Sequence, residues 1–148
     1  MYETVETMHR LEEIIELSAA RAGPAMRQNF AVPAWTMSAE EFVAFWGEGR
    51  MASVSTASAR GDVHVAPLDV QLIDGVFRVA TFADALRLGD HRARPRCAIS
   101  SWDGPYRAVI VYGDAREAGS DGVMVTVEIA PSRIYAIRPP AGHHSLTP

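Results

Sequence analysis

The chain has 148 residues, 48% hydrophobic and 22% charged, which is enough for one domain with its own core. The net charge of −4 argues against a nucleic-acid-binding protein, and the single cysteine excludes an intrachain disulfide and a cysteine zinc cluster. No apolar run approaches the ~20 residues of a membrane span, and the acidic N-terminus does not resemble a signal peptide, so we expect a cytoplasmic protein.

The first part of the chain predicts two helices joined by an arm. Residues 3–20 carry apolar side chains at helical spacing, and a glycine-proline pair ends that helix. Residues 24–37 show no period, which predicts an extended arm. A second, short helix begins at Ser38, which forms a capping-box pattern with Glu41. Because an isolated helix of this length is marginal in water, we expect the first helix to dock at or across a dimer interface.

From residue 50 onward the hydrophobic period changes to two, which is typical of strands. The expected strands cover residues 50–57, 63–73, 76–81, 96–102, 106–117, 123–129 and 132–137. Asp74-Gly75 predicts a hairpin between the second and third strands, because the tight turn needs positive φ. Closing six or seven antiparallel strands into a barrel removes the exposed edges of the sheet. The sequence therefore predicts a mainly β (α+β) barrel preceded by two helices.

Four arginines lie between the third and fourth expected strands. Arg87, Arg92, Arg94 and Arg96 stand at or near strand ends, where backbone donors and the hydroxyl of Thr81 can join them. Guanidinium groups bind phosphate through paired donors. As a set, these residues form a candidate phosphate site, although any one of them is as well explained as a solvated loop charge.

Three other features have ordinary explanations beside their functional ones. Asp62 and His64 lie two residues apart on one face of an expected strand. They could form an acid–base pair, but such a spacing more commonly gives a surface hydrogen bond. His143 and His144 suggest a metal site, but adjacent residues in a tail rarely converge on one ion, so we expect no metal. Cys97 lies in an apolar strand and is interpreted as a packed thiol.

Four segments carry a likeness to a known family through their order and spacing. They are the hairpin MASVSTASARGDVHVAPLDV, the strand VFRVATFADALRL with its threonine, the segment RARPRCAI, and the tryptophan-strand-glycine segment from Trp102 to Gly113. With them, residues 50–137 resemble the pyridoxamine-phosphate oxidase-like split β-barrels, a superfamily of flavin- and deazaflavin-binding proteins. The resemblance implies an antiparallel split barrel, and we assign residues 38–138 to this flavin-binding domain. The helix and arm at 1–37 precede it, and Pro139-Pro140 starts a tail at 139–148 that we expect to be mobile.

The resemblance also implies a cofactor site. Its residues would be Ala66, Pro67, Leu68 and Asp69 along the flavin, Thr81 and Arg87 at the phosphate, and Arg107 near the cofactor at the dimer interface. The implied assembly is a homodimer that holds FMN between its subunits and acts on a small-molecule substrate. The deazaflavin F420 is the alternative cofactor.

Departures from the family pattern limit the activity that the resemblance implies. The vitamin oxidases have serine and arginine where this chain has Ala85 and Leu86, and a glutamine where it has Ala108. The implied function is therefore a flavin-dependent oxidoreductase that is not the vitamin oxidase itself. The alternatives are an F420-dependent reductase and a non-catalytic flavin- or haem-binding protein, for which His64 and His91 are the only barrel histidines. We single out no catalytic residue, because the hydride chemistry belongs to the cofactor.

Overall fold

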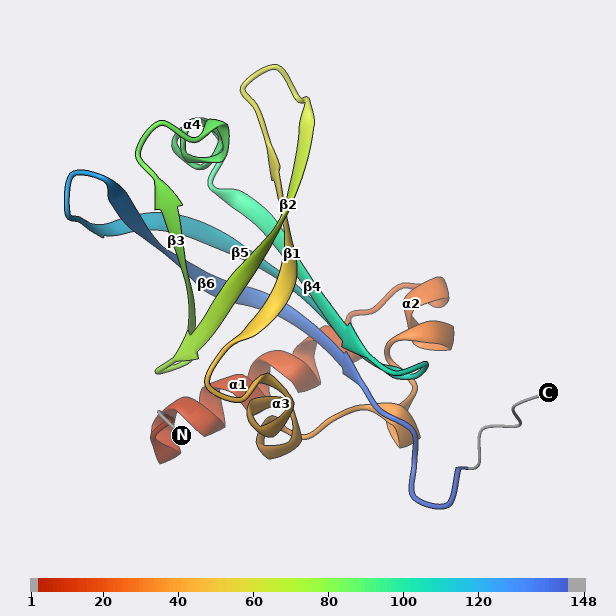
Figure 1. Cartoon of the computed structure of the whole chain (residues 1–148). Helices are drawn as coiled ribbons and strands as arrows, with labels where there is room; N and C mark the ends of the chain where they lie inside the picture. Colours follow the sequence, from red (N-terminus) through yellow and green to blue (C-terminus); the bar gives the residue numbers. More distant parts are fainter. Residues whose placement is uncertain (1–2, 144–148) are drawn as a thin grey trace.

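The computed structural model describes residues 3–143, which form a six-stranded antiparallel barrel with helices around it (Figure 1). The elements are α1 (Val5–Ala20), α2 (Pro24–Asn29), the short 3-10 helix η1 (Pro33–Trp35), α3 (Ala39–Trp46), β1 (Arg50–Ala57), β2 (Val63–Ile73), β3 (Val76–Phe82), α4 (Leu86–Ala93), β4 (Arg96–Asp103), β5 (Arg107–Ser120) and β6 (Met124–Ile137). The expected fold class, a mainly β barrel after N-terminal helices, is confirmed. Within residues 3–143, no helix has the length and apolar character needed to cross a bilayer.

The strands close in the order β1-β2-β3-β6-β5-β4, and every neighbouring pair is antiparallel. The pairing of β2 with β3 is short: only three residue pairs form, from Gln71↔Arg78 to Ile73↔Val76. The turn beside these pairs is the expected one, with positive φ at Asp74 and Gly75. Beyond it the two strands diverge (Figure 1), which leaves the barrel split along one side.

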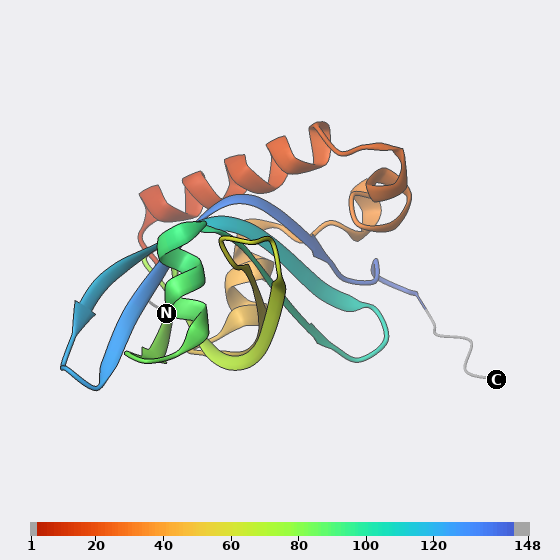
Figure 2. The ribbon, with the colours of Figure 1, turned by 90° about the horizontal axis from the view of Figure 1, so that it is seen from above.

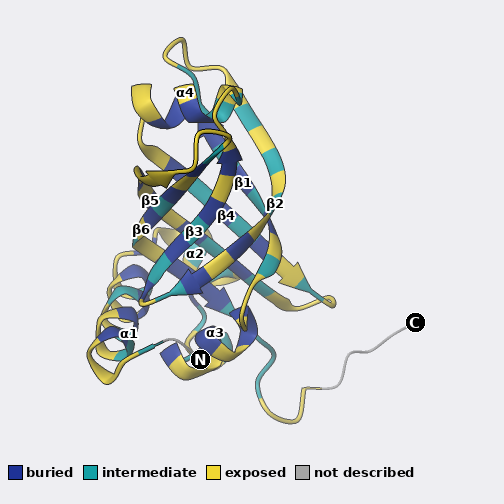
Figure 3. Cartoon of the chain, turned by 60° about the vertical axis from the view of Figure 1, so that its left-hand side comes forward, coloured by how far each residue is buried: buried dark blue, intermediate teal, exposed yellow. Residues whose placement is uncertain are grey.

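The core lies inside the barrel and extends to its lower end, where α3 covers the opening (Figure 1). Side chains alternate between buried and exposed along the strands, as Figure 3 shows. The Trp46 ring packs at 4.9 Å from the Phe77 ring, and its indole N–H donates to the Val70 carbonyl at 2.8 Å. The expected capping box between Ser38 and Glu41 begins α3, so this helix is positioned by both its cap and its apolar face.

The first helix docks on its own barrel. It runs along β6, as Figure 2 shows, and buries Leu11 and Ile15 in the core. Near its end, the Ser18 hydroxyl accepts a hydrogen bond from the Ile134 N–H at 3.0 Å. The expectation of an extended arm after it is wrong, because α2 and η1 form there. Residues 21–37 thus return the chain to the same barrel instead of carrying the helix away from it.

Two other boundaries differ from those expected. The arginine-rich segment contains α4. Periodicity did not predict this helix, because eight residues are too few to establish a helical period. The last two expected strands are one strand, β6, because the chain passes Pro131 with a bulge. Opposite the bulge, the α-carbon of Gly113 approaches the Ala130 carbonyl so closely that a Cβ would lie 2.5 Å from that oxygen. Only glycine fits this crossing.

Candidate functional site

The end of β3 and the start of α4 bring together two of the predicted site residues. Thr81 faces the inside of the barrel and has 0% exposed surface. The Nε–H of Arg87, in the first turn of α4, donates to the Thr81 hydroxyl oxygen at 3.0 Å. Arg87 is half-buried, and no carboxylate among residues 3–143 forms an ion pair with it. Its two terminal nitrogens are therefore able to bind an external anion.

The three other arginines of this segment already have partners. Arg92 pairs with Glu117, and Arg96 lies 3.4 Å from an Asp114 oxygen. Arg94 donates to the Ala59 carbonyl at 3.1 Å. All three are exposed, so solvent screens their charges. The structure thus separates Arg87 from the other members of the set.

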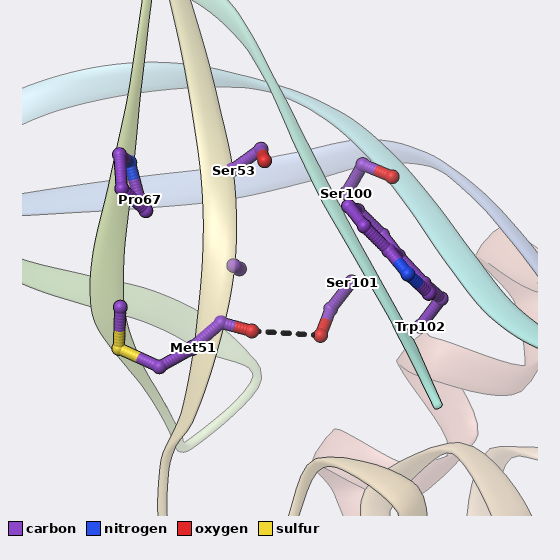
Figure 4. Close-up of a pocket in the computed structure, with 7 residues that line it drawn as sticks. Met51, Ser53, Pro67, Ser100, Ser101 and Trp102 are labelled. Carbon is purple, nitrogen blue, oxygen red and sulfur yellow. Dashed lines mark hydrogen bonds between the residues drawn. The ribbon is translucent and has the colours of Figure 1, made fainter. Parts of the chain in front are cut away.

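Pro67 lines a hollow on the outer face of the barrel. This hollow, of about 310 Å³, lies over β1 and β4 and is shown in Figure 4. Its other lining residues are Met51, Ala52, Ser53, Ser100, Ser101 and Trp102. Trp102 is 63% exposed and Met51 61%, so two large apolar side chains stand at the rim without cover from this chain. None of the lining residues is charged, so the hollow could hold a flat, largely apolar ligand.

A second hollow, of about 400 Å³, lies on the other side of β2, in the split between β2 and β3. Leu68 and Asp69 line it from β2, and Arg78 and Ala80 line it from β3. Arg78 has a buried Nε without a partner among the described residues and only a distant ion pair, 3.9 Å from Glu128. Sequence reasoning missed Arg78, because an arginine in an alternating strand has the pattern of any outward-facing residue.

Arg107 does not join the other predicted residues. It starts β5, and β5 pairs with β4 from Arg107 at one end to Asp114 at the end next to α4. Arg107 therefore lies at the opposite end of the barrel from Arg87. It contacts Asp103 at 3.2 Å and the Phe45 ring at 5.1 Å. Within one chain it cannot contribute to a site at α4.

A polar network that the sequence did not predict lies at α4. The Nδ1 of His64 on β2 lies 2.6 Å from an Asp90 oxygen, and the hydroxyl of Thr56 on β1 donates to the same oxygen at 2.7 Å. Although burial raises the pKa of Asp90, the hydrogen bonds from His64 and Thr56 hold it below its ordinary value. The proposed pairing of His64 with Asp62 is corrected: the partner is Asp90, 26 residues away in sequence. No local spacing could have shown it.

Comparison with known proteins supports the fold and no closer relationship. No protein-family model and no curated protein matches the chain. Among solved structures, a candidate pyridoxamine 5′-phosphate oxidase from Listeria innocua has 10% identity and a TM-score of 0.60, with 66% of this chain and 95% of that chain covered. An F420 reductase has 14% identity and a TM-score of 0.57, with 62% and 94% covered. The haem storage protein HutZ from Vibrio cholerae has 12% identity and a TM-score of 0.61, with 70% and 97% covered.

The chain has the fold of the pyridoxamine-phosphate oxidase-like split barrels. Two residues that depart from the pattern of this family, Ala85 and Leu86, lie at the start of α4 in this split barrel. Ala85 stands at the N-cap without a side-chain hydrogen bond, and Leu86 is exposed. The start of α4 therefore offers Arg87 and backbone N–H groups to an anion, and no hydroxyl or second guanidinium.

The remaining sequence candidates of the split barrel take no part in this site. Cys97 is buried, and burial, with the nearby Asp114 carboxylate, raises the pKa of its thiol to about 12. It is packed as expected. Among residues 3–143, no three histidine, cysteine or acidic side chains gather as metal ligands. His143 packs its ring 4.9 Å from the Trp35 ring, and His144 lies outside the described residues.

Proposed function

We propose that this protein binds a flavin-type cofactor, FMN or the deazaflavin F420, and acts as an oxidoreductase on a small molecule. The observation that carries the proposal is Arg87, a half-buried arginine that a buried hydroxyl orients and no described carboxylate neutralises. Such a group suits a phosphate, because guanidinium nitrogens bind phosphate oxygens in pairs. The F420 reductase among the structural neighbours gives the fold a precedent for this ligand class.

Other parts of the barrel are the predicted contacts for the rest of such a cofactor. The segment from Ala66 to Asp69 separates the two hollows, and its backbone is the predicted contact for the ring system. When bound, the cofactor supplies the hydride chemistry. The protein supplies the phosphate contact at Arg87 and backbone contacts from β2. The apolar wall with Trp102 lies at the opposite end of β4 from α4, so one chain does not bring it to its own Arg87. We assign no acid or base to the reaction.

We also propose that two copies of the chain form the site. Most outward-facing side chains of β1, β2 and β4 are uncharged, namely Met51, Ser53, Ser55, Val63, Val65, Pro67, Ala98, Ser100 and Trp102. Asp69 on β2 and Arg96 on β4 face the same way and are charged. A mostly uncharged face that exposes Val65, Met51 and Trp102 is typical of a protein–protein interface. A second copy on this face would also supply an Arg107, which the first copy cannot bring to its own Arg87.

Haem binding is a second candidate, because His64 has the surroundings of a metal ligand. A ligating histidine usually directs its other ring nitrogen at a carboxylate, which fixes the tautomer. In His64, the Nδ1 is held by Asp90, and the side chain is 40% exposed, which leaves Nε2 free for an iron. HutZ, a neighbour in fold, is a haem storage protein. An Asp90→Asn variant that loses a Soret band from added haemin would support this candidate.

The test begins with the ligand that the purified protein carries. Absorbance and mass of the released compound distinguish FMN, F420 and haem directly. The apoprotein is then titrated with each of them, and Arg87→Ala is compared with Arg116→Ala, whose exposed arginine pairs with Glu128. Because a charge-assisted contact contributes roughly 1.5–3 kcal/mol, Arg87→Ala should weaken FMN or F420 binding by about tenfold or more. Equal affinities of the two variants would refute the phosphate assignment.

A further inference from the structure

Helix α4 is attached to the barrel by two polar contacts that are buried or half-buried, besides an exposed ion pair from Arg92 to Glu117 on β5. The first is the hydrogen bond from Arg87 to Thr81 on β3. The second is Asp90, one turn later, which accepts from Thr56 on β1 and contacts His64 on β2. The two attachments lie on either side of the split between β2 and β3, because Thr81 belongs to one wall and His64 to the other. Helix α4 thus spans the opening at this end of the barrel.

The helix depends on these attachments for its position. It has eight residues, no side-chain cap at Ala85 and a glycine, Gly89, in its middle. A helix this short is not stable in water by itself, and glycine weakens it further. Leu88 is its only buried apolar side chain. One apolar contact does not fix the rotation of a helix, because dispersion and burial are non-directional, whereas hydrogen bonds do so through their geometry.

The contacts of Asp90 also limit the movement of Arg87, which lies on the same helix. The two residues are three positions apart, so they lie on neighbouring surfaces of the same helix. Asp90 is 5% exposed, and its two contacts are shorter than the Arg87–Thr81 bond, at 2.7 and 2.6 Å. A buried carboxylate with these partners tolerates little movement, because displacement leaves a buried charge unpaired. Because Arg87 and Asp90 belong to the same short helix, a rotation of α4 that displaces Asp90 also displaces Arg87.

We propose that Asp90, held by Thr56 and His64, is a positioning residue for the cofactor site: it fixes α4 so that Arg87 presents its terminal nitrogens to a phosphate. This inference rests on the proposed function, since the anion it serves is the phosphate of a flavin-type cofactor. Asp90 does not touch the cofactor. It acts through Arg87, and its effect on affinity exists only while the arginine is present.

A double-mutant cycle tests this dependence. Asp90→Ala should weaken FMN or F420 binding about tenfold in the wild-type chain and less than twofold in the Arg87→Ala chain. Arg92→Gln breaks only the exposed ion pair of the same helix with Glu117, and exposed pairs contribute little, so it is the control and should leave affinity unchanged. An Asp90→Ala effect of equal size in both backgrounds would overturn the proposal, because a general structural role does not need Arg87. Thr56→Val, which removes one of the two hydrogen bonds, replaces Asp90→Ala if that variant does not fold.

A second measurement separates this inference from the proposed function. If the wild-type protein binds neither FMN nor F420, the proposed function fails, and the positioning role is then read from the Arg87 Nε–H by ¹⁵N NMR. That proton should exchange with solvent at least tenfold faster in Asp90→Asn and at the wild-type rate in Arg92→Gln. An unchanged exchange rate in Asp90→Asn would show that Asp90 does not position Arg87.

Discussion

Thr81 and Arg87 are joined by a 3.0 Å hydrogen bond from the arginine Nε–H to the threonine hydroxyl, across the turn between β3 and α4. Thr81 has no exposed surface, so its hydroxyl does not meet a ligand that approaches from solvent. The Thr81 oxygen accepts from Nε of Arg87. A bidentate phosphate contact through the two terminal nitrogens does not need Nε. The bond therefore orients the arginine outward, toward the place where an anion would bind.

Replacing Thr81 by valine should weaken cofactor binding without unfolding the barrel. Valine has nearly the same shape but cannot accept the Arg87 hydrogen bond, so the guanidinium loses its orientation. The expected loss of FMN or F420 affinity is about five- to tenfold, which corresponds to a hydrogen bond of about 1–1.5 kcal/mol. Thr81→Ser keeps the hydroxyl and should bind as the wild type does. Fluorescence titration measures both, and equal losses in the two variants would contradict this role.

His91 should make the protein less stable at mildly acidic pH. Burial lowers the pKa of His91 below the ordinary value, although the Asp90 charge opposes this, and the Arg87 charge lowers it further. Neither ring nitrogen has a hydrogen-bond partner among the described residues. Below pH ~6.5 the unfolded chain takes up a proton that the folded chain refuses, so stability falls as pH falls toward the folded pKa. Above pH ~6.5 the contribution of His91 to stability does not change with pH.

The matching variant is His91→Leu, which removes the titrating group. Its free energy of unfolding should exceed that of the wild type by more at pH 5.5 than at pH 8. Urea unfolding at the two pH values measures the difference. A difference between the two proteins that does not change with pH would show that His91 is not the group responsible.

Cys97 should be inert to thiol reagents in the folded protein. Its pKa of about 12 leaves almost no thiolate at pH 8, and the thiolate is the reactive species. Its burial also excludes the reagent. We expect one equivalent of Ellman's reagent to react in denaturant and none within an hour in buffer. Rapid labelling of the native protein would indicate that β4 opens locally.

Packing of α1 on its own barrel predicts a large cost for truncating its buried face. Leu11→Ala removes a side chain with 0% exposure and should lower the free energy of unfolding by about 2–5 kcal/mol. Leu17→Ala, on the same helix, removes a side chain that is 50% exposed and should cost less than about 0.5 kcal/mol. Similar small losses for both would mean that the helix is not docked on β6 in solution.

The apolar side chains exposed on the outer face of β1, β2 and β4 predict a dimer at micromolar concentration. Light scattering should give twice the chain mass for the wild type. Trp102→Glu places a charge at the rim of that face and should give a monomer, because burying an unpaired carboxylate is costly. Val123→Glu is the control, since Val123 is equally exposed, at 64%, in the turn that precedes β6. A monomeric wild type would remove both the interface and the shared site.

Elements whose signals are local can be predicted from the sequence. Ser38 and Glu41 show the start of α3, and Asp74-Gly75 shows the hairpin between β2 and β3, because capping and positive φ depend on a few adjacent residues. The bounds of β1 and β2 also follow from alternation alone. The sequence selected Thr81 and Arg87 through a family resemblance, and the structure places them in contact, although their role in binding a cofactor stays a prediction.

The pairing of distant polar groups cannot be predicted from local sequence. Asp90 and His64 are 26 residues apart, and nothing near either one indicates the other. The same holds for the isolation of Arg87, since three neighbouring arginines of identical chemistry have partners and this one lacks a described carboxylate. Side-chain pairing across a barrel depends on strand register and on where a short helix crosses the opening. Both are set by packing over the whole chain, because a one-residue change of register turns every side chain of a strand to the other face.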